Sequence, residues 1–140
     1  ENKKVKVVTA CERLLKSEEL FDPNIVKVVV DNESNALYFS RSCIPNIREN
    51  NQLLINEKKF FKSEIFYKHV GIYGFKKDFL IKYSSLDNSN LEKLEMLEQL
   101  RILQNGYKIK IIETQYKSLG IDNEDDYIKA LSMHNLINKK

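Results

Sequence analysis

The sequence predicts an α/β protein in which a mixed β-sheet is flanked by helices. Three observations favour this class. Short β-rich runs alternate with helix-compatible segments, no internal repeat or linker interrupts the chain, and 140 residues suffice for one domain with a hydrophobic core. We therefore expect a single domain over residues 1–140.

The first half of the chain predicts three strands, of which the second and third form a hairpin. The β-rich runs are residues 5–10, 25–30 and 36–41. A polar, helix-compatible segment at residues 12–19 predicts a short helix, which the stretch 21–24 (FDPN) ends. Turn-forming residues at 31–35 connect the two hairpin strands. Residues 46–63 are polar with apolar islands, which fits either a loop or a segment that faces a partner.

The second half predicts two strands and three helices. The strands are residues 65–75 and 108–113, the latter with alternating polar and apolar side chains. The helices are residues 76–83, 91–104 and 123–136. Asn105-Gly106 is a typical signal for the end of the second helix, and acidic residues favour the start of the third.

Composition excludes several classes of function. The 23 basic and 20 acidic residues give a net charge of +3, too weak a balance to predict nucleic-acid binding. Cys11 and Cys43 have no neighbours at metal-binding spacing, so we expect free thiols. Lys6 interrupts the first apolar run, so this run does not predict the core of a signal peptide. No run approaches the ~20 apolar residues of a membrane span. We expect a cytoplasmic protein without a membrane or nucleic-acid partner.

Two polar side chains flank a glycine on the strand at residues 65–75. His69, Gly71 and Tyr73 project from one face because side chains alternate along a strand, and a regular strand would place His69 and Tyr73 ~13 Å apart. Gly71 leaves a gap between them where a ligand could approach the backbone. The alternative is a His and a Tyr that neighbouring protein groups satisfy in the core.

An acidic stripe marks the predicted helix at residues 91–104. Glu95, Glu98 and Gln99 fall within about a third of its circumference. Carboxylates and carboxamides hold polyol hydroxyls well, so the stripe favours sugar binding. The alternative is a solvated face with intrahelical pairs such as Glu98 with Arg101.

Two further charged residues come at the ends of predicted strands. Asp122, before the last helix, could cap that helix or serve as one carboxylate ligand of Mg²⁺. Arg41 could bind a substrate carboxylate through two hydrogen bonds, or form a structural pair. The four glycines form neither G-x-G-x-x-G nor the P-loop pattern, and His69 and His134 are too distant for a local zinc motif.

Six stretches together resemble one enzyme family. They are residues 23–29 (PNIVKVV), 36–41 (ALYFSR), 44–45 (IP), 69–74 (HVGIYG), 94–101 (LEMLEQLR) and 120–122 (GID). In this order they resemble the 3-deoxy-manno-octulosonate cytidylyltransferase family, also called CMP-KDO synthetases. The match runs from about residue 7 to about residue 131 and covers the C-terminal part of the family. The resemblance implies a nucleotide-diphospho-sugar transferase-like, Rossmann-like fold.

The resemblance also implies an activity and a set of site residues. The family transfers CMP from CTP to the sugar acid KDO, with Mg²⁺, giving CMP-KDO and pyrophosphate for lipopolysaccharide biosynthesis, and acts as a homodimer. The residues that match sugar-acid-binding positions are His69, Tyr73, Glu98 and Gln99. Arg41 borders that site, and Asp122 matches a catalytic, metal-binding aspartate.

The family's nucleotide-binding N-terminal half has no counterpart in this sequence. We therefore expect this chain alone to be inactive and to need the missing half. Two other interpretations remain open at this point: a non-catalytic dimerisation module, and part of a cytidylyltransferase for a related sugar acid such as sialic acid.

Overall fold

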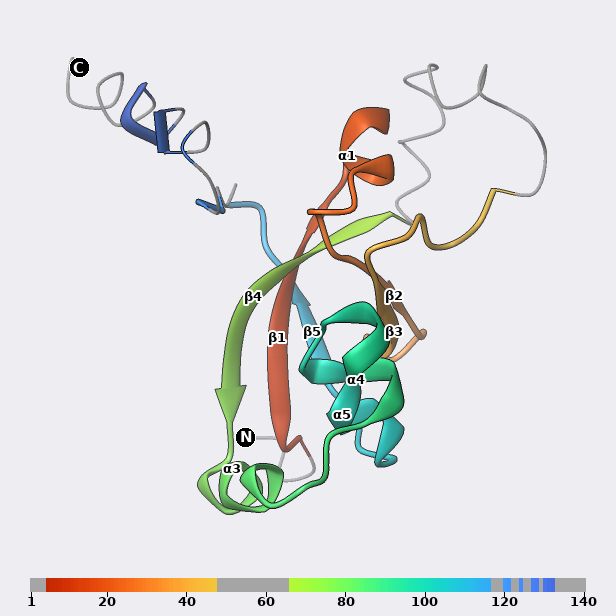
Figure 1. The fold of residues 1–140 in the computed structure, drawn as a ribbon, viewed down its shortest axis with the longest axis vertical. Helices are drawn as coiled ribbons and strands as arrows, with labels where there is room; N and C mark the ends of the chain where they lie inside the picture. Colours follow the sequence, from red (N-terminus) through yellow and green to blue (C-terminus); the bar gives the residue numbers. More distant parts are fainter. Residues whose placement is uncertain are drawn as a thin grey trace.

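The computed structural model describes residues 5–47, 66–116, 120–121, 124, 127–128 and 130–132 (Figure 1). Its strands are β1 (Val7–Arg13), β2 (Lys27–Val30), β3 (Ala36–Ser40), β4 (Tyr67–Phe75) and β5 (Lys110–Glu113). They form one sheet in the order β3-β2-β4-β1-β5. β1 and β5 are parallel, whereas the other neighbouring strands are antiparallel. The predicted mixed sheet, with β2 and β3 as a hairpin, is confirmed.

The sheet curls until its two outer strands meet. The Ala36 N–H donates to the Ile109 carbonyl at 2.8 Å, and the Ile111 N–H donates to the Ser34 carbonyl at 2.8 Å. The residues that lead into β3 thus cover the outer side of β5, and the two strands lie close together in Figure 1. This pairing protects part of an edge that would otherwise be open to other chains.

The helices are α1 (Ser17–Phe21), α3 (Lys77–Ser84), α4 (Asn90–Glu95) and α5 (Gln99–Gln104). The prediction of a helix at residues 12–19 was partly wrong, because Glu12 and Arg13 extend β1. They lie opposite Lys68 and Tyr67 of β4. Pairing with β4 outweighs the local helix preference, which is a weak determinant by comparison.

The helix predicted at residues 91–104 is two helices. Met96 adopts a left-handed conformation with φ 54° and ends α4, and α5 begins at Gln99. α4 starts with a capping box in which Ser89 and Glu92 bond each other's backbone N–H. The break buries Leu97 between the two helices. It also redirects the side chains that one continuous helix would have placed in a stripe.

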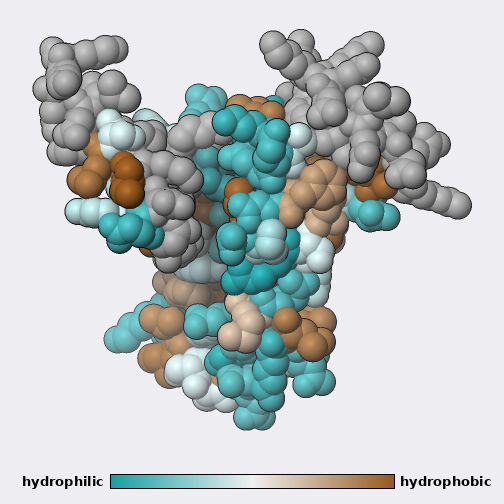
Figure 2. Space-filling model, turned by 45° about the horizontal axis from the view of Figure 1, so that its top comes forward, coloured by the Kyte–Doolittle hydropathy of each residue, from teal (hydrophilic) through white to brown (hydrophobic). Residues whose placement is uncertain are grey.

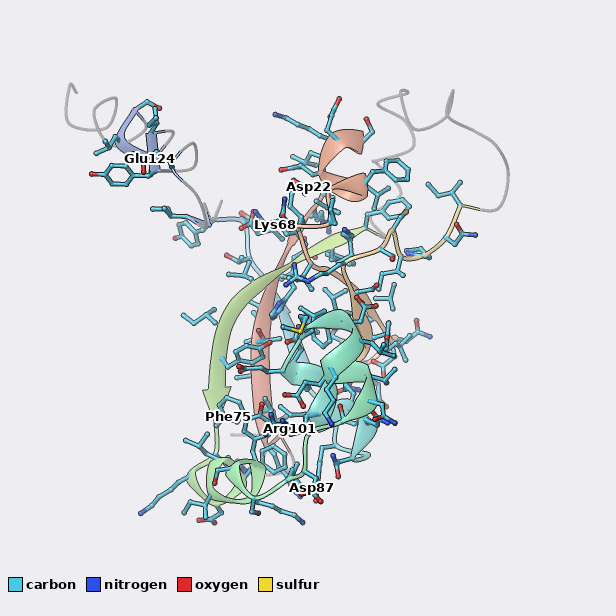
Figure 3. All side chains as sticks on the ribbon, in the orientation of Figure 1. Asp22, Lys68, Phe75, Asp87, Arg101 and Glu124 are labelled. Carbon is cyan, nitrogen blue, oxygen red and sulfur yellow. The ribbon has the colours of Figure 1, made fainter. Side chains whose placement is uncertain are left out.

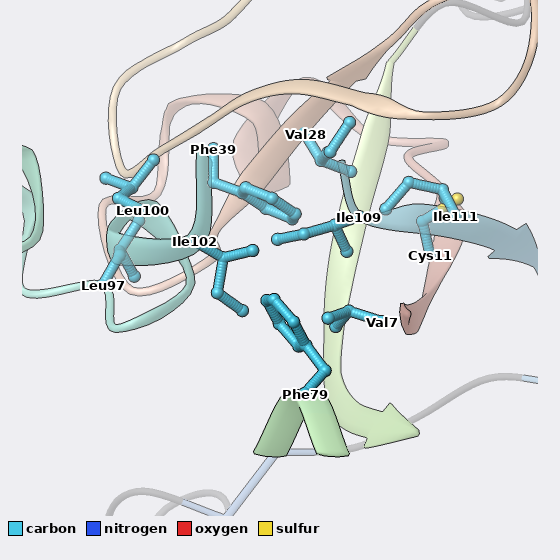
Figure 4. Close-up of a cluster of buried hydrophobic side chains, with 11 residues drawn as sticks. Val7, Cys11, Val28, Phe39, Phe79, Leu97, Leu100, Ile102, Ile109 and Ile111 are labelled. Carbon is cyan, nitrogen blue, oxygen red and sulfur yellow. The ribbon is translucent and has the colours of Figure 1, made fainter. Parts of the chain in front are cut away.

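The hydrophobic core lies between the inner face of the sheet and the helices (Figure 4). Phe39 comes from β3, Ile109 from the residue before β5, Leu100 and Ile102 from α5, and Phe79 from α3. Each fully buried side chain of this size contributes about 1.5–3 kcal/mol of hydrophobic stabilisation. The core therefore fixes α5 against β3 of the sheet, and α4 packs on α5.

The opposite face of the sheet carries exposed apolar side chains. Ile72 of β4 is 66% exposed and Ile112 of β5 is 57% exposed. Figure 2 shows hydrophobic side chains as separate patches on a largely hydrophilic surface. No helix within the described part of the chain combines the length and apolar character needed to cross a bilayer.

Three smaller expectations concern the cysteines and the segments at residues 46–63 and 123–136. Cys11 and Cys43 are free thiols, as predicted. Most of the segment 46–63 lies outside the described residues. The described residues of the predicted last helix, 124, 127–128 and 130–132, are helical.

Candidate sugar-acid site

A bulge in β4 brings His69 and Tyr73 together. Tyr73 lies opposite Thr9 of β1, but Val70 lies opposite the next residue, Ala10, so two residues of β4 have no partner on β1. The ring centroids of His69 and Tyr73 are therefore 5.4 Å apart. The expected separation of ~13 Å was wrong because it assumed a regular strand.

Thr9 holds this bulge from the neighbouring strand. Its side-chain hydroxyl lies 2.7 Å from the Ile72 carbonyl oxygen, 3.2 Å from the Val70 carbonyl oxygen and 2.9 Å from Nε2 of His69. Thr9 is only 3% exposed, so these contacts are shielded from water. A Cβ added at Gly71 would meet no atom within 4 Å. The gap predicted at Gly71 is thus real.

The bulge forms one wall of a hollow of about 400 Å³, which we call the β4 hollow. α3 and the turn between α4 and α5 supply the other walls, and Figure 3 shows Phe75 at the α3 end of β4 and Arg101 on α5. The lining residues are Val26, His69, Gly71, Tyr73, Phe75, Leu80, Tyr83, Met96, Leu97, Glu98, Gln99 and Ile102. This volume is within the usual range for a small-molecule site.

Four of the predicted site residues line the β4 hollow: His69, Tyr73, Glu98 and Gln99. Gln99 is 6% exposed, and its Nε2 has no hydrogen-bond partner within the described ranges. Glu98 is exposed at the start of α5, and its side chain makes no capping bond. Buried polar groups are nearly always bonded, so the unpaired Gln99 amide indicates a place for a polar ligand.

Burial keeps both ring side chains of the bulge uncharged near neutral pH. It lowers the pKa of His69 from 6.5 to about 4. Burial is also the largest cause that raises the pKa of the Tyr73 phenol, followed by Tyr83 and Glu98. At neutral pH these groups can therefore exchange hydrogen bonds with a ligand without carrying charge themselves.

Arg41 does not line the β4 hollow, and its guanidinium already has partners. Nε donates to the Glu95 carbonyl at 3.0 Å, and Nη1 donates to the Pro23 carbonyl at 3.1 Å. The Glu95 carboxylate in turn accepts from the Ser40 hydroxyl at 2.7 Å and from the Arg41 N–H at 3.0 Å. The predicted stripe of Glu95, Glu98 and Gln99 was wrong in this respect, because the left-handed Met96 turns Glu95 toward β3.

Asp122, the predicted metal ligand, lies outside the described residues. Within the parts of the chain that the structure describes, no group of three or more His, Cys, Asp or Glu side chains could hold a metal ion. Gly120 and Ile121, which precede Asp122, are exposed. A Mg²⁺ site at Asp122 stays a prediction.

The model of one family, described as cytidylyltransferase, matches residues 1–111. The chain belongs to the cytidylyltransferase family. A 3-deoxy-manno-octulosonate cytidylyltransferase of Fusobacterium nucleatum is 45% identical over 132 residues, which are 94% of this chain and 49% of the relative. The corresponding enzyme of Geotalea uraniireducens is 43% identical over 131 residues, 94% of this chain and 52% of the relative.

A solved structure supports the same family assignment. It is a CMP:2-keto-3-deoxy-manno-octonic acid synthetase complexed with CTP, with a TM-score of 0.80 and 33% identity. The match covers 96% of this chain and 51% of that chain. This cytidylyltransferase chain thus spans about half the length of the curated relatives that it matches.

Sequence reasoning missed two residues of the site in this cytidylyltransferase. Tyr83 of α3 stacks on Phe75 at 5.8 Å and donates from its hydroxyl to the Glu98 carbonyl at 3.3 Å. Thr9 contacts His69 from 60 positions away in the sequence. Neither had a local signal, because each joins the site through tertiary packing. Phe75 of β4 also lines the hollow.

Proposed function

We propose that this chain is the sugar-acid-binding part of a 3-deoxy-manno-octulosonate cytidylyltransferase. The enzyme transfers CMP from CTP to KDO and releases pyrophosphate. The observation that carries the proposal is the convergence of His69, Tyr73, Glu98 and Gln99 on the β4 hollow. The names of the relatives and of the solved structure support the same substrate class.

The lining of the β4 hollow suits a polyhydroxylated acid. The Gln99 amide and the Tyr73 hydroxyl can donate hydrogen bonds to carboxylate or hydroxyl oxygens, and the Glu98 carboxylate can accept from a sugar hydroxyl. Phe75, whose ring centroid is 5.9 Å from that of Tyr73, adds an apolar wall for the carbon skeleton. This mixture of a few placed polar groups on apolar walls is typical of small-molecule sites.

In the proposed reaction the anomeric hydroxyl of KDO attacks the α-phosphorus of CTP. The new oxygen–phosphorus bond forms as the bond to the β-phosphate oxygen breaks, the hydroxyl proton is lost, and pyrophosphate leaves. The contribution of this chain is to hold the sugar acid in position, which accounts for much of the catalysis in such transfers. Bound Mg²⁺ would neutralise phosphate charge, and Asp122 is the catalytic and metal-binding residue of the proposal.

The chain acts in this proposal together with the rest of the cytidylyltransferase. Among the described residues, β2 pairs with β4 only at Tyr67 and Lys68, with one further bond from the His69 N–H to the Val26 carbonyl. From Val70 onward, the only strand that pairs with β4 in the described part of the chain is β1. The open side of such a long strand is a suitable place for another strand to add, which supports completion of the sheet by the missing half, where CTP would bind.

Two further parts of the proposal, the homodimer and the pathway, rest on the family resemblance, and a third, the cytoplasmic location, rests on the composition. The enzyme forms a homodimer through the segment around residues 46–66, most of which lies outside the described residues. It acts in the cytoplasm. Its product supplies lipopolysaccharide biosynthesis.

A titration of the full chain with KDO, followed by calorimetry, tests the proposal. The wild-type chain should bind KDO, and Glu98→Ala should weaken binding at least about tenfold, because a hydrogen bond to a charged group contributes about 1.5–3 kcal/mol. Glu18→Ala is the matched control, since Glu18 is exposed on α1 and does not line the hollow. Absence of KDO binding, even with the other half of a relative supplied, would contradict the proposal. Dimerisation without KDO binding, seen by light scattering, would favour an assembly module.

A further inference from the structure

We propose that Thr9 is a positioning residue that fixes the tautomer of His69. Its hydroxyl keeps the proton of the imidazole on Nε2 and leaves Nδ1 as a hydrogen-bond acceptor in the β4 hollow. The role of Nδ1 toward a ligand rests on the proposed function, whereas the tautomer itself does not.

The proton count around Thr9 decides which group donates. The hydroxyl has one proton, and three atoms lie within hydrogen-bond distance of its oxygen: the Ile72 carbonyl at 2.7 Å, the Val70 carbonyl at 3.2 Å and Nε2 of His69 at 2.9 Å. Carbonyl oxygens can only accept, so the hydroxyl proton must point toward them. Nε2 must then carry a proton and donate it to the Thr9 oxygen.

The opposite arrangement is unfavourable. If the hydroxyl donated to Nε2, the Thr9 oxygen would face the Ile72 carbonyl at 2.7 Å with no proton between them. The Thr9 hydroxyl is shielded from water because Thr9 is buried in β1, so two acceptor oxygens facing each other there without a proton are unfavourable. The bulge therefore controls the imidazole through a single hydroxyl.

The surroundings of His69 leave it with one proton and one free nitrogen. Burial keeps the imidazole neutral near pH 7, so only one nitrogen is protonated. The neighbouring rings are Phe39, whose centroid is 5.0 Å away in an edge-on arrangement, and Tyr73. Within the described residues no group donates a hydrogen bond to Nδ1, which therefore remains available to a ligand.

This assignment gives the β4 hollow a polarity. Nδ1 of His69 and the Glu98 carboxylate are acceptors, whereas Nε2 of Gln99 and the Tyr73 hydroxyl can donate. A sugar hydroxyl would thus bind at His69 and Glu98, and the sugar-acid carboxylate at Gln99 and Tyr73. A carboxylate facing Nδ1 would find no proton there, so the tautomer selects which end of the ligand lies at the bulge.

Long-range proton–nitrogen NMR of the full chain tests the tautomer without any ligand. Resonances of His69 are assigned by their loss in His69→Gln. Near pH 7.5 we expect a protonated Nε2 and an unprotonated Nδ1 in the wild type. Thr9→Val, which has nearly the same shape but no hydroxyl, should give a mixture of both tautomers, and Thr9→Ser should restore the wild-type pattern.

Two results would overturn the proposal: a wild-type His69 protonated on Nδ1, or a folded Thr9→Val variant with the wild-type tautomer. If Thr9→Val does not fold, the wild-type spectrum still decides. KDO affinity supplies a second readout, with about a tenfold loss expected for Thr9→Val and less than a threefold loss for Thr9→Ser. If the wild type binds KDO but His69 is protonated on Nδ1, only this inference is contradicted. If His69 is protonated on Nε2 but KDO does not bind, only the proposed function is contradicted.

Discussion

Two neighbouring regions of the molecule use buried polar groups in opposite ways. In the first, which we call the Lys27 junction (Lys27, Ser40, Arg41 and Glu95), the polar atoms are bonded to protein. The Lys27 ammonium donates to the Asp22 carbonyl at 2.8 Å, to the Ile25 carbonyl at 2.7 Å and to the Arg41 carbonyl. Glu95 joins Ser40 and Arg41 of the same junction.

In the second region, the β4 hollow, hydrogen-bonding capacity remains unused. Nε2 of Gln99 is buried without a partner among the described residues. Within the same residues Nδ1 of His69 accepts no hydrogen bond, because Thr9 contacts the other ring nitrogen. Unpaired buried groups cost stability, and a folded chain keeps them where a ligand completes the bonding. Polar groups that are hydrogen-bonded to protein thus hold this fold together, whereas polar groups without a protein partner mark its site. Removing a group should therefore harm stability in the junction and binding in the hollow.

The largest expected effect comes from the centre of the Lys27 junction. Lys27 is fully buried, and Lys27→Met would remove this donor from three carbonyl groups, of which the Asp22 carbonyl would keep only the Ile25 N–H at 3.2 Å. We expect the free energy of unfolding to fall by about 3–4 kcal/mol, since each group left unsatisfied costs about 1–3 kcal/mol. Urea unfolding measures this loss. Lys77→Met, at an exposed position of α3, is the control. Equal losses of stability for the two changes would contradict a stabilising role of the Lys27 junction.

The next effect is a pH dependence that arises from His69. Burial lowers its pKa from 6.5 to about 4 in the folded chain, so between these values the unfolded chain binds more protons. The stability contributed by the neutral imidazole is therefore complete above pH 6.5 and is lost as the pH falls toward 4. This shift corresponds to about 3 kcal/mol. Urea unfolding across this range should show a steeper decline for wild type than for His69→Gln, and parallel curves would contradict the assignment.

A smaller effect is expected at the ion pair that joins α4 to α5. The Glu92 carboxylate accepts from Nε of Arg101 at 2.8 Å and from the Ser89 N–H at 3.2 Å. The hydrogen bond from Arg101 is the main cause that lowers the pKa of Glu92, so this stability is present above pH 4.5 and is lost as the pH falls below it.

Glu92→Gln should therefore destabilise the chain by about 1–2 kcal/mol at pH 7, with a smaller loss in acid, as measured by thermal unfolding. The control is Glu33→Gln. Glu33 pairs with Lys108 at 3.6 Å, but both side chains are more than two-thirds exposed. An exposed pair contributes about 0–1 kcal/mol. If Glu33→Gln lowered the stability as much as Glu92→Gln, burial of the Glu92–Arg101 pair would not explain its stabilising effect.

Local patterns in the sequence were sufficient for most of the fold. The alternating side chains of β5 and the turn between β2 and β3 depend on neighbours in the chain, so their prediction was confirmed. The break at Met96 was not predictable in this way. Non-glycine residues seldom adopt a left-handed conformation, and Met96 does so because the packing of Leu97 and the pair of Glu92 with Arg101 hold it there.

The site was predictable only as a set of candidates. Alternation along β4 and the family motifs indicated His69, Tyr73 and Gln99, and the structure brings them together in the hollow. Their actual geometry depends on the register between β1 and β4, which no local pattern specifies. The same limit explains why Thr9 was missed. It also explains why Arg41, given two roles from sequence, could be placed with Glu95 only by the structure.

The smallest stability effect, and the sharpest test of the comparison, belongs to Gln99. Gln99→Met keeps the length of the side chain and removes the buried amide that has no partner for Nε2. The free energy of unfolding should stay the same or rise by up to about 1 kcal/mol, because an unsatisfied polar group is replaced by an apolar one. KDO affinity should nevertheless fall about tenfold. Gln115→Met, at an exposed position outside the hollow, should change neither quantity. A large loss of stability for Gln99→Met would place Gln99 with the junction residues, and it would remove the unpaired amide as a reason to locate the sugar acid there.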